Sequence, residues 1–165
     1  MEDELGPGDQ APSGGDQVRL VLGSDHAGLA LRNFIAGYLI ENGHEVAHVG
    51  AMSTASYDYP DAADAAIEVL KKAEADLAIL ICGSGIGISI RANRHHGIRA
   101  ALCTTEYMAR VAREHNHANV LCLGERVLGT DQAASIVQAF LAVEESENPR
   151  HLKRVEKLDA ATAEN

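Results

Sequence analysis

The sequence predicts an α/β protein with a three-layer Rossmann-like fold: a five-stranded parallel sheet, helices on both faces, and an extra C-terminal helix. One observation is that short apolar runs, typical of strands buried on both faces, alternate with longer segments whose apolar residues recur at helical spacing. A second is that the run at 77–82 is followed by three glycines within five residues, a turn typical of the ligand-binding edge of an open sheet. The order βαβαβαβαβαα has no internal repeat and favours one doubly wound sheet.

Each predicted element has its own signal. The apolar runs predict strands at 18–22, 45–49, 77–82, 98–103 and 120–123. Helical spacing predicts helices at 29–40, 62–73, 85–93, 105–116, 130–143 and 150–163. Asn42-Gly43 is expected to close the first helix, Pro60 suits the first turn of the second, and Thr104 or Thr105 is expected to cap the fourth.

The N-terminal stretch differs from the rest of the chain. Residues 1–17 are rich in glycine, proline and acidic side chains, which predicts a disordered acidic tail before a single domain at 18–165. The formal net charge of −10 argues against nucleic acid or an anionic membrane as a partner, and no apolar run approaches membrane-spanning length. The three cysteines are an odd number within apolar runs, which indicates reduced thiols and a cytoplasmic protein.

The glycine loop after the third predicted strand is the first candidate site. Cys82 ends that strand, and a helix beginning near Gly85 would aim backbone N–H groups at the turn, favouring an anion, a developing oxyanion or a thiolate. The alternative is a buried cysteine before a tight turn. A dinucleotide fingerprint belongs after the first strand, a P-loop requires Gly-Lys-Ser/Thr, and a cysteine phosphatase requires arginine where this chain has Ile88. The loop therefore suits chemistry on a neutral carbonyl that becomes charged in the transition state.

Other candidate residues lie at predicted element ends. Asp25 and His26 follow the first strand, so they should share an edge with Cys82, although an Asp-His pair can also be a simple helix cap. Tyr59 is either a packing residue or a wall of the pocket. His115 ends a helix and is two residues from His117, a spacing that points the two rings apart and argues against a metal site.

The last predicted helix has a basic face. Its cationic residues fall at positions i, i+3, i+4 and i+7, and they are Arg150, Lys153, Arg154 and Lys157. Such a face is either a solvated surface or a grip for a phosphate group.

Taken together, these residues resemble the ribose-5-phosphate isomerase B and galactose-6-phosphate isomerase family. The matching segments run in order from about Val18 to Asp159: 23–28 (GSDHAG), 59–60 (YP), 81–89 (ICGSGIGIS), 92–93 (AN), 97–100 (GIRA), 112–116 (AREHN), 118–121 (ANVL), 124–126 (GER), 150–151 (RH) and 154 (R). Only the acidic tail lies outside the match. Other family members place a glutamate further along the glycine loop, where this chain has Ile88-Ser89.

The resemblance implies aldose–ketose isomerisation of a phosphosugar through a cis-enediolate, without metal or organic cofactor. It gives Cys82 the role of the base, His115 and Asp25 that of opening the sugar ring, and Ser84 the family's loop hydroxyl. It assigns binding of the reacting oxygens or of the phosphate to His26, Tyr59, Gly83, Gly85, Ile86, Gly87, Asn116, Arg126, Arg150 and Arg154.

Helix geometry then predicts a homodimer with shared active sites, with a tetramer as the alternative. The helix after the fourth strand should run back along the sheet for about 15 Å before reaching His115, at about 1.5 Å per residue. Cys82 and His115 of one chain should therefore lie near opposite edges, whereas the resemblance requires both at one substrate. A two-fold dimer resolves this conflict.

The sequence leaves several phosphosugars as candidate substrates. Ribose 5-phosphate is the leading expectation. Galactose 6-phosphate, allose 6-phosphate and a four-carbon erythrulose phosphate are alternatives, because pocket depth decides among them. A non-catalytic phosphosugar sensor is a further alternative, and the joint presence of Cys82, His115 and Asp25 argues against it, since a binder needs no proton-transfer groups.

Overall fold

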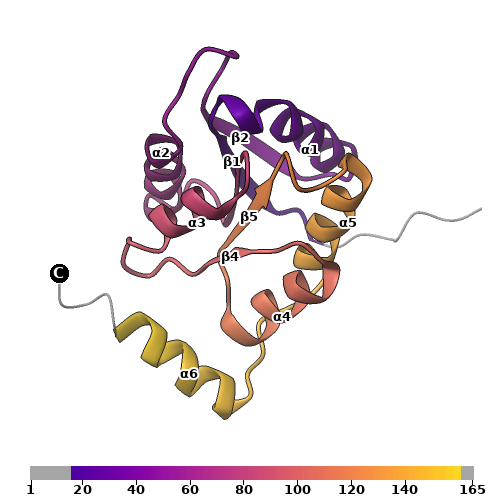
Figure 1. Ribbon diagram of the computed structural model, residues 1–165. Helices are drawn as coiled ribbons and strands as arrows, with labels where there is room; N and C mark the ends of the chain where they lie inside the picture. The colour runs from indigo at the N-terminus through magenta and orange to yellow at the C-terminus, as the bar shows by residue number, and fades with distance from the viewer. Residues whose placement is uncertain (1–15, 161–165) are drawn as a thin grey trace, which may run out of the picture.

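The structure is a computed structural model that describes residues 16–160 (Figure 1). The predicted acidic tail falls almost entirely on residues 1–15, and the end of the last predicted helix falls on 161–163; both lie outside the described residues. The strands are β1 (Arg19–Ser24), β2 (Glu45–Gly50), β3 (Leu77–Cys82), β4 (Ala100–Leu102) and β5 (Val120–Gly124). They form one parallel sheet in the order β2-β1-β3-β5-β4.

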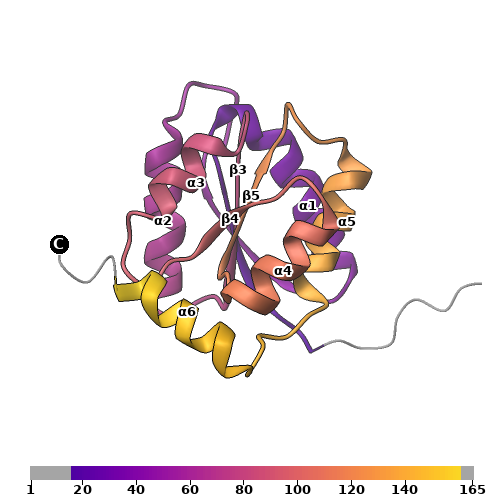
Figure 2. The same ribbon diagram turned by 60° about the horizontal axis from the view of Figure 1, so that its bottom comes forward.

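The helices form two layers around this sheet, as Figures 1 and 2 show. They are α1 (Leu29–Glu41), α2 (Tyr59–Lys71), α3 (Ile86–Ala92), α4 (Glu106–Asn116), α5 (Thr130–Leu141) and α6 (Pro149–Ala160), with a short 3₁₀ turn, η1 (His26–Gly28), before α1. Helices α1, α4 and α5 cover one face, α2 and α3 cover the other, and α6 packs against α4. The predicted three-layer α/β fold with an extra C-terminal helix is confirmed.

The alternation of β3 explains why both layers are needed. Its six residues are all buried. Leu77, Ile79 and Ile81 belong to the core under α1 and α5, whereas Ala78, Leu80 and Cys82 belong to the core under α2 and α3. Because successive side chains point to opposite faces, a continuous apolar run is stable only with a helix layer on each side.

The main departure from prediction is β4, expected at 98–103 and found only at Ala100–Leu102. Two asparagine side chains bond to the backbone at the amino-terminal end of the observed strand. Asn119 Oδ1 accepts the N–H of Arg99 at 2.9 Å, and Asn93 both accepts from the N–H of Ala100 at 2.8 Å and donates to its carbonyl at 2.9 Å. Such local side-chain bonds compete with a strand ladder.

The strand order places a crevice between β1 and β3. From β1 the chain crosses to β2 on one side, while β3 pairs with the other side of β1. At such a reversal the connecting helices diverge, and ligands bind beyond the carboxyl ends of the strands. The loops that follow β1, β3 and the neighbouring β5 therefore meet at one place.

Candidate active site

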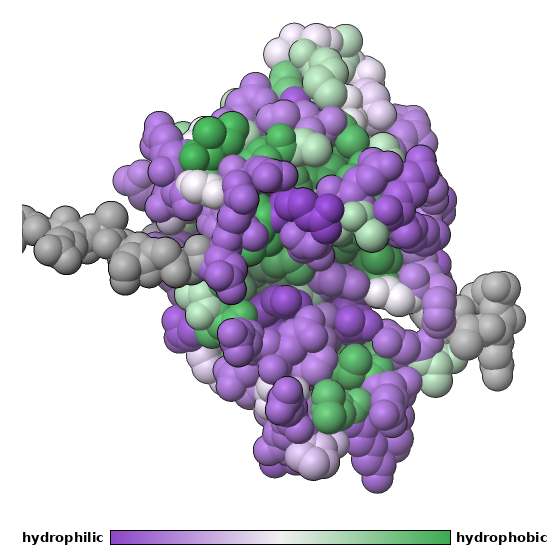
Figure 3. All heavy atoms as spheres, turned by 180° about the vertical axis from the view of Figure 1, so that it is seen from behind, coloured by the Kyte–Doolittle hydropathy of each residue, from purple (hydrophilic) through white to green (hydrophobic). Residues whose placement is uncertain are grey.

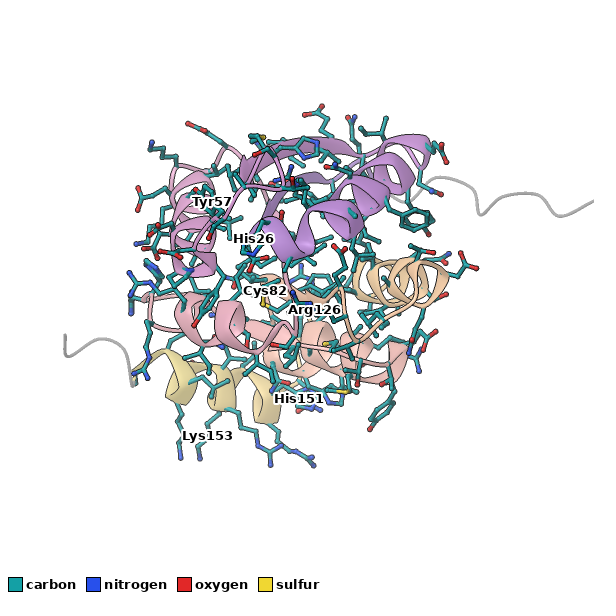
Figure 4. All side chains as sticks on the ribbon, turned by 45° about the horizontal axis from the view of Figure 1, so that its top comes forward. His26, Tyr57, Cys82, Arg126, His151 and Lys153 are labelled. Carbon is teal, nitrogen blue, oxygen red and sulfur yellow. The ribbon has the colours of Figure 1, made fainter. Side chains whose placement is uncertain are left out.

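A cavity of about 360 Å³ opens at the carboxyl ends of β1, β3 and β5. Its lining comes from four separate parts of the chain: Asp25, His26, Ala27, Tyr59, Cys82, Gly83, Ser84, Gly87, Arg126 and Val127. The expectation that Asp25, His26 and Cys82 share one sheet edge is confirmed. In Figure 4, His26, Cys82 and Arg126 lie together near the centre of the view, whereas His151 and Lys153 lie on α6.

Cys82 is the last residue of β3 and lies in the layer between the sheet and helices α2 and α3. Its side chain is 4% exposed, and its Sγ accepts the N–H of Gly85 at 3.1 Å. Gly85 has φ +78°, and a Cβ there would lie 2.6 Å from Leu102 Cδ1, so this turn requires glycine. The loop thus aims the N–H dipole of Gly85 at the sulfur.

The other two cysteines have different surroundings. Both are buried and neither lines the cavity. Burial raises the pKa of the Cys103 thiol to about 11, and burial raises the pKa of Cys122 as well. Both therefore stay protonated near neutral pH. Of the three thiols, Cys82 is the one that lines the cavity.

Asp25 and His26 form the wall contributed by β1. Asp25 is buried, and its Oδ1 accepts the N–H of Gly28 at 3.0 Å, so the residue both caps η1 and lines the cavity. His26 Nδ1 lies 3.1 Å from the backbone nitrogen of Tyr57 and 3.3 Å from the carbonyl oxygen of Tyr57, so it accepts from the N–H in one tautomer and donates to the carbonyl in the other. A neutral ring that accepts at Nδ1 carries its proton on Nε2 and can donate from that atom.

Arg126 and Tyr59 close two further sides. The guanidinium of Arg126 lies over Gly83, where a Cβ would be 3.1 Å from Nη1. Within residues 16–160 Arg126 forms no ion pair, so its charge is open to an anion. Tyr59 begins α2 and packs its ring on Gly87, whose Cβ would lie 2.6 Å from Tyr59 Cζ. Tyr59 is therefore both a packing residue and a pocket wall.

The remaining loop residues contribute backbone. Ser84 lines the cavity, and its Oγ accepts the N–H of Ile86 at 3.2 Å. The N–H groups of Gly85 and Ile86 thus have partners inside the loop, and neither residue lines the cavity. Direct contact between these two N–H groups and a substrate stays a prediction.

A second group of predicted site residues lies elsewhere on the chain. His115 is in the last turn of α4, and its ring lies 4.2 Å from that of His151 on α6, at an interplanar angle of 32°. Partial burial, with His115 and Arg150 nearby, lowers the pKa of His151. None of His115, Asn116, Arg150 and Arg154 lines the cavity around Cys82.

The basic face predicted on the last helix is present. Arg150, Lys153, Arg154 and Lys157 line one open groove on α6. Asn116 instead lines a cavity of about 390 Å³ beside β4, together with Asn93 and Leu158. Within one chain, the residues that the family resemblance assigns to one substrate therefore lie in separate places.

Some pocket residues were not expected from the sequence. Ala27 and Val127 line the cavity because they flank His26 and Arg126. Tyr57 contributes through its backbone N–H, a contact for which the sequence offers no signal. His117 has φ +49° at the end of α4, and its Nε2 donates to the carbonyl oxygen of Ser146 at 3.0 Å, whereas the ring of His115 packs on His151.

Neither a metal-binding cluster nor a membrane-spanning helix is found among the described residues. No group of three or more His, Cys, Asp or Glu side chains within residues 16–160 is arranged to hold a metal ion. None of the helices in that range is both long enough and apolar enough to cross a membrane.

Comparison with known proteins identifies the family. The model of the Ribose/Galactose Isomerase family matches residues 20–158, from β1 into α6. The chain belongs to this family. Ribose-5-phosphate isomerase B of Escherichia coli is 42% identical over 142 residues, which are 86% of this chain and 95% of that protein. The corresponding enzyme of Mycolicibacterium paratuberculosis is 39% identical over 142 residues, covering 86% and 89% of the two chains.

Solved structures of ribose/galactose isomerase family members have the same fold. Ribose-5-phosphate isomerase B of Clostridium thermocellum is 48% identical, with a TM-score of 0.83 over 87% of this chain and 96% of its own. The type B ribose 5-phosphate isomerase of Trypanosoma brucei is 42% identical, with a TM-score of 0.84 over 88% and 99% of the two chains. The resemblance stated from the sequence is thereby confirmed.

Proposed function

We propose that this chain interconverts ribose 5-phosphate and ribulose 5-phosphate, with Cys82 as the base. The observation that carries the proposal is a buried thiol, held by the N–H of Gly85, at the floor of a cavity walled by Asp25, His26 and Arg126. Relatives that are 39–48% identical over most of the chain are named ribose-5-phosphate isomerases, which supports ribose 5-phosphate over larger sugars.

The reaction moves one proton between neighbouring carbons. The Cys82 thiolate takes the proton from C2 of the open-chain aldose, and its electrons form the C1–C2 double bond of a cis-enediolate as O1 gains negative charge. A proton then moves from the O2 hydroxyl to O1. The proton held by Cys82, or one exchanged with water, is delivered to C1 as O2 becomes the ketone, and the thiolate is regenerated. Ser84 offers its hydroxyl to these oxygens, and one well-placed donor to such an oxyanion is worth about 3 kcal/mol.

The phosphate binds at the opposite end of the sugar. Arg126 and His26 supply a charge and a donor from this chain, and cations bind phosphate through charge-assisted hydrogen bonds. That binding energy holds C1 and C2 against Cys82, so it contributes to the rate as well as to affinity.

We further propose that each site is completed by a second copy of the chain. His115 of the partner subunit then opens the sugar ring together with Asp25. Asn116 of the partner subunit holds the reacting oxygens, and Arg150 and Arg154 of the partner subunit bind the phosphate. This arrangement is supported by the separation of the two partial sites within one chain.

The edge of the sheet at β4 supports such a dimer. Among residues 16–160, strand β4 pairs with β5 alone and forms one edge of the sheet (Figure 2). The side chain of Asn93 occupies the outward N–H and carbonyl of Ala100 on that edge. Large apolar side chains are exposed on helices α3, α4 and α6: Ile86, Ile90, Tyr107, Met108, Leu152 and Leu158. Exposed large apolar side chains on the helices around a sheet edge form a surface that association would cover.

Subunit complementation tests the shared site. Cys82→Ala and His115→Ala proteins should each be inactive or severely impaired, and they are mixed, dissociated and reassociated. Random pairing makes half of the dimers mixed, and each mixed dimer has one intact site, so about a quarter of wild-type activity should return. Subunit exchange confirmed by mass spectrometry without any recovery would refute the shared site.

The three free thiols also support our proposal that the enzyme works in the reducing cytoplasm.

A further inference from the structure

Helix α1 begins without a side chain that caps it. Its N-cap residue is Gly28, which makes no side-chain cap bond. A Cβ at Gly28 would lie 2.3 Å from the carbonyl oxygen of Ile81, so no residue with a capping side chain fits there. The first N–H groups of a helix need acceptors, and α1 must find one elsewhere.

Glu125, far along the chain, supplies that acceptor. Its Oε2 accepts the N–H of Leu31, the third residue of α1, at 2.9 Å across 94 positions of sequence. A carboxylate at the amino end of a helix satisfies a free donor and lies favourably in the field of the helix dipole.

The backbone around Glu125 is tied to the loop that carries the thiol. The N–H of Glu125 donates to the carbonyl of Cys82 at 3.0 Å, and the N–H of Arg126 donates to the carbonyl of Gly83 at 2.9 Å. Glu125 therefore joins three parts of the chain: the end of β3, the loop after β5, and the first turn of α1.

These three parts carry the opposite walls of the pocket. His26 lies in η1, immediately before α1, and Arg126 follows Glu125 directly. Two backbone hydrogen bonds hold the Arg126 loop against β3, but they do not reach α1. The Glu125 carboxylate makes the contact that links the Arg126 loop to the helix behind His26.

We propose that Glu125 is a positioning residue, which fixes the spacing between His26 and Arg126 by capping α1 from the loop after β5. The kinetic consequence rests on the proposed function, because it assumes that these two side chains bind the phosphosugar. The geometric part, the coupling of the two loops, does not depend on any activity.

Three variants test the proposal. Glu125→Ala removes the acceptor, and Glu125→Gln keeps an amide oxygen that can still accept from Leu31. The matched control is Asp76→Ala, since Asp76 Oδ2 also accepts a backbone N–H of another element, that of Arg19 at 3.0 Å, but at the amino-terminal edge of the sheet. Steady-state kinetics with ribose 5-phosphate, calorimetric binding of ribose 5-phosphate and amide hydrogen exchange are measured for each protein.

We expect Glu125→Ala to raise KM at least tenfold with a smaller change in kcat. The Kd for ribose 5-phosphate should rise by a similar factor. Glu125→Gln should stay within threefold of wild type, and Asp76→Ala should leave KM unchanged. Amide exchange in Glu125→Ala should accelerate at Leu31 and also at residues 26–28. In wild type and Asp76→Ala these amides should keep their protection.

Two results would overturn the proposal: a KM within twofold of wild type in Glu125→Ala, or accelerated exchange confined to Leu31. An equal rise in KM in Asp76→Ala would also overturn it, because the effect would then come from general loss of stability. Wild-type protein that does not isomerise ribose 5-phosphate would refute the proposed function instead. Hydrogen exchange in Glu125→Ala would then decide the positioning role without reference to activity.

Discussion

Replacing Gly28 by alanine tests how closely the pocket's β1 wall is packed on β3. The added methyl group would lie 2.3 Å from the carbonyl oxygen and 2.6 Å from the carbonyl carbon of Ile81, whereas Gly28 has φ −102°, which alanine adopts freely. The cost is therefore steric and not conformational. Because a backbone carbonyl in a central strand cannot rotate away, we expect a loss of about 3 kcal/mol in the free energy of unfolding, the upper end of the usual overpacking cost.

The same helix offers a matched control. Gly37 lies within α1, and a Cβ there would meet nothing within 4 Å. Gly37→Ala should raise the free energy of unfolding by about 0.5–1 kcal/mol, because alanine loses less backbone entropy in a helix. The two glycine-to-alanine changes should thus have opposite signs.

Urea and thermal unfolding, followed by circular dichroism at one protein concentration, measure both effects. For a chain of this size, 3 kcal/mol corresponds to a fall of about 6–12 °C in Tm for Gly28→Ala. Gly28→Ala should also lower isomerase activity, because a shifted η1 moves Asp25 and His26. Equal stability of Gly28→Ala and wild type would refute the packing described between η1 and β3.

Two further predictions concern phosphate binding and acid stability. Arg154→Ala should raise KM for ribose 5-phosphate, because it removes a charge-assisted contact worth roughly 1.5–3 kcal/mol. Steady-state kinetics should show far less effect on ribose lacking the phosphate. Equal losses on both sugars would mean that α6 is merely structural. Hydrogen bonds from Arg91 and His95 lower the pKa of Asp64, so its stabilising contribution is present above the ordinary aspartate pKa and is lost as pH falls through the depressed value. Asp64→Asn should therefore flatten the fall in Tm measured from about pH 5 downward, and an unchanged slope would contradict the pairing.

Most of the fold could be predicted because its signals are local. The run at 77–82 is buried on both faces, and such a run requires helices on both sides of a parallel sheet. The length of β4 could not be predicted in this way. The backbone at its amino-terminal end bonds to the side chains of Asn119 and Asn93, which lie in other segments and reach Arg99 and Ala100 through the fold.

In the candidate site, too, some positions could be predicted from the sequence and others could not. Cys82 ends β3, and Asp25 and His26 follow the end of β1. Because parallel strands bring their carboxyl ends to one edge, the sequence predicts that these residues lie together. The separate position of His115 followed from the length of one helix. The roles of Glu125 and of the Tyr57 backbone depend on hydrogen bonds between loops, which leave no periodic pattern in the sequence.

The proposed function depends on removal of the C2 proton of ribose 5-phosphate by the Cys82 thiolate. It is tested by incubating ribose 5-phosphate in D₂O with wild-type or Cys82→Ala protein and following the C2 proton by NMR, with binding of the sugar measured by calorimetry. Wild-type protein should form ribulose 5-phosphate and exchange the proton for deuterium. Cys82→Ala should slow this exchange by at least about 100-fold while binding the sugar nearly as well, since it removes the base and leaves the phosphate contacts intact. Exchange at the wild-type rate in Cys82→Ala would show that Cys82 is not the base.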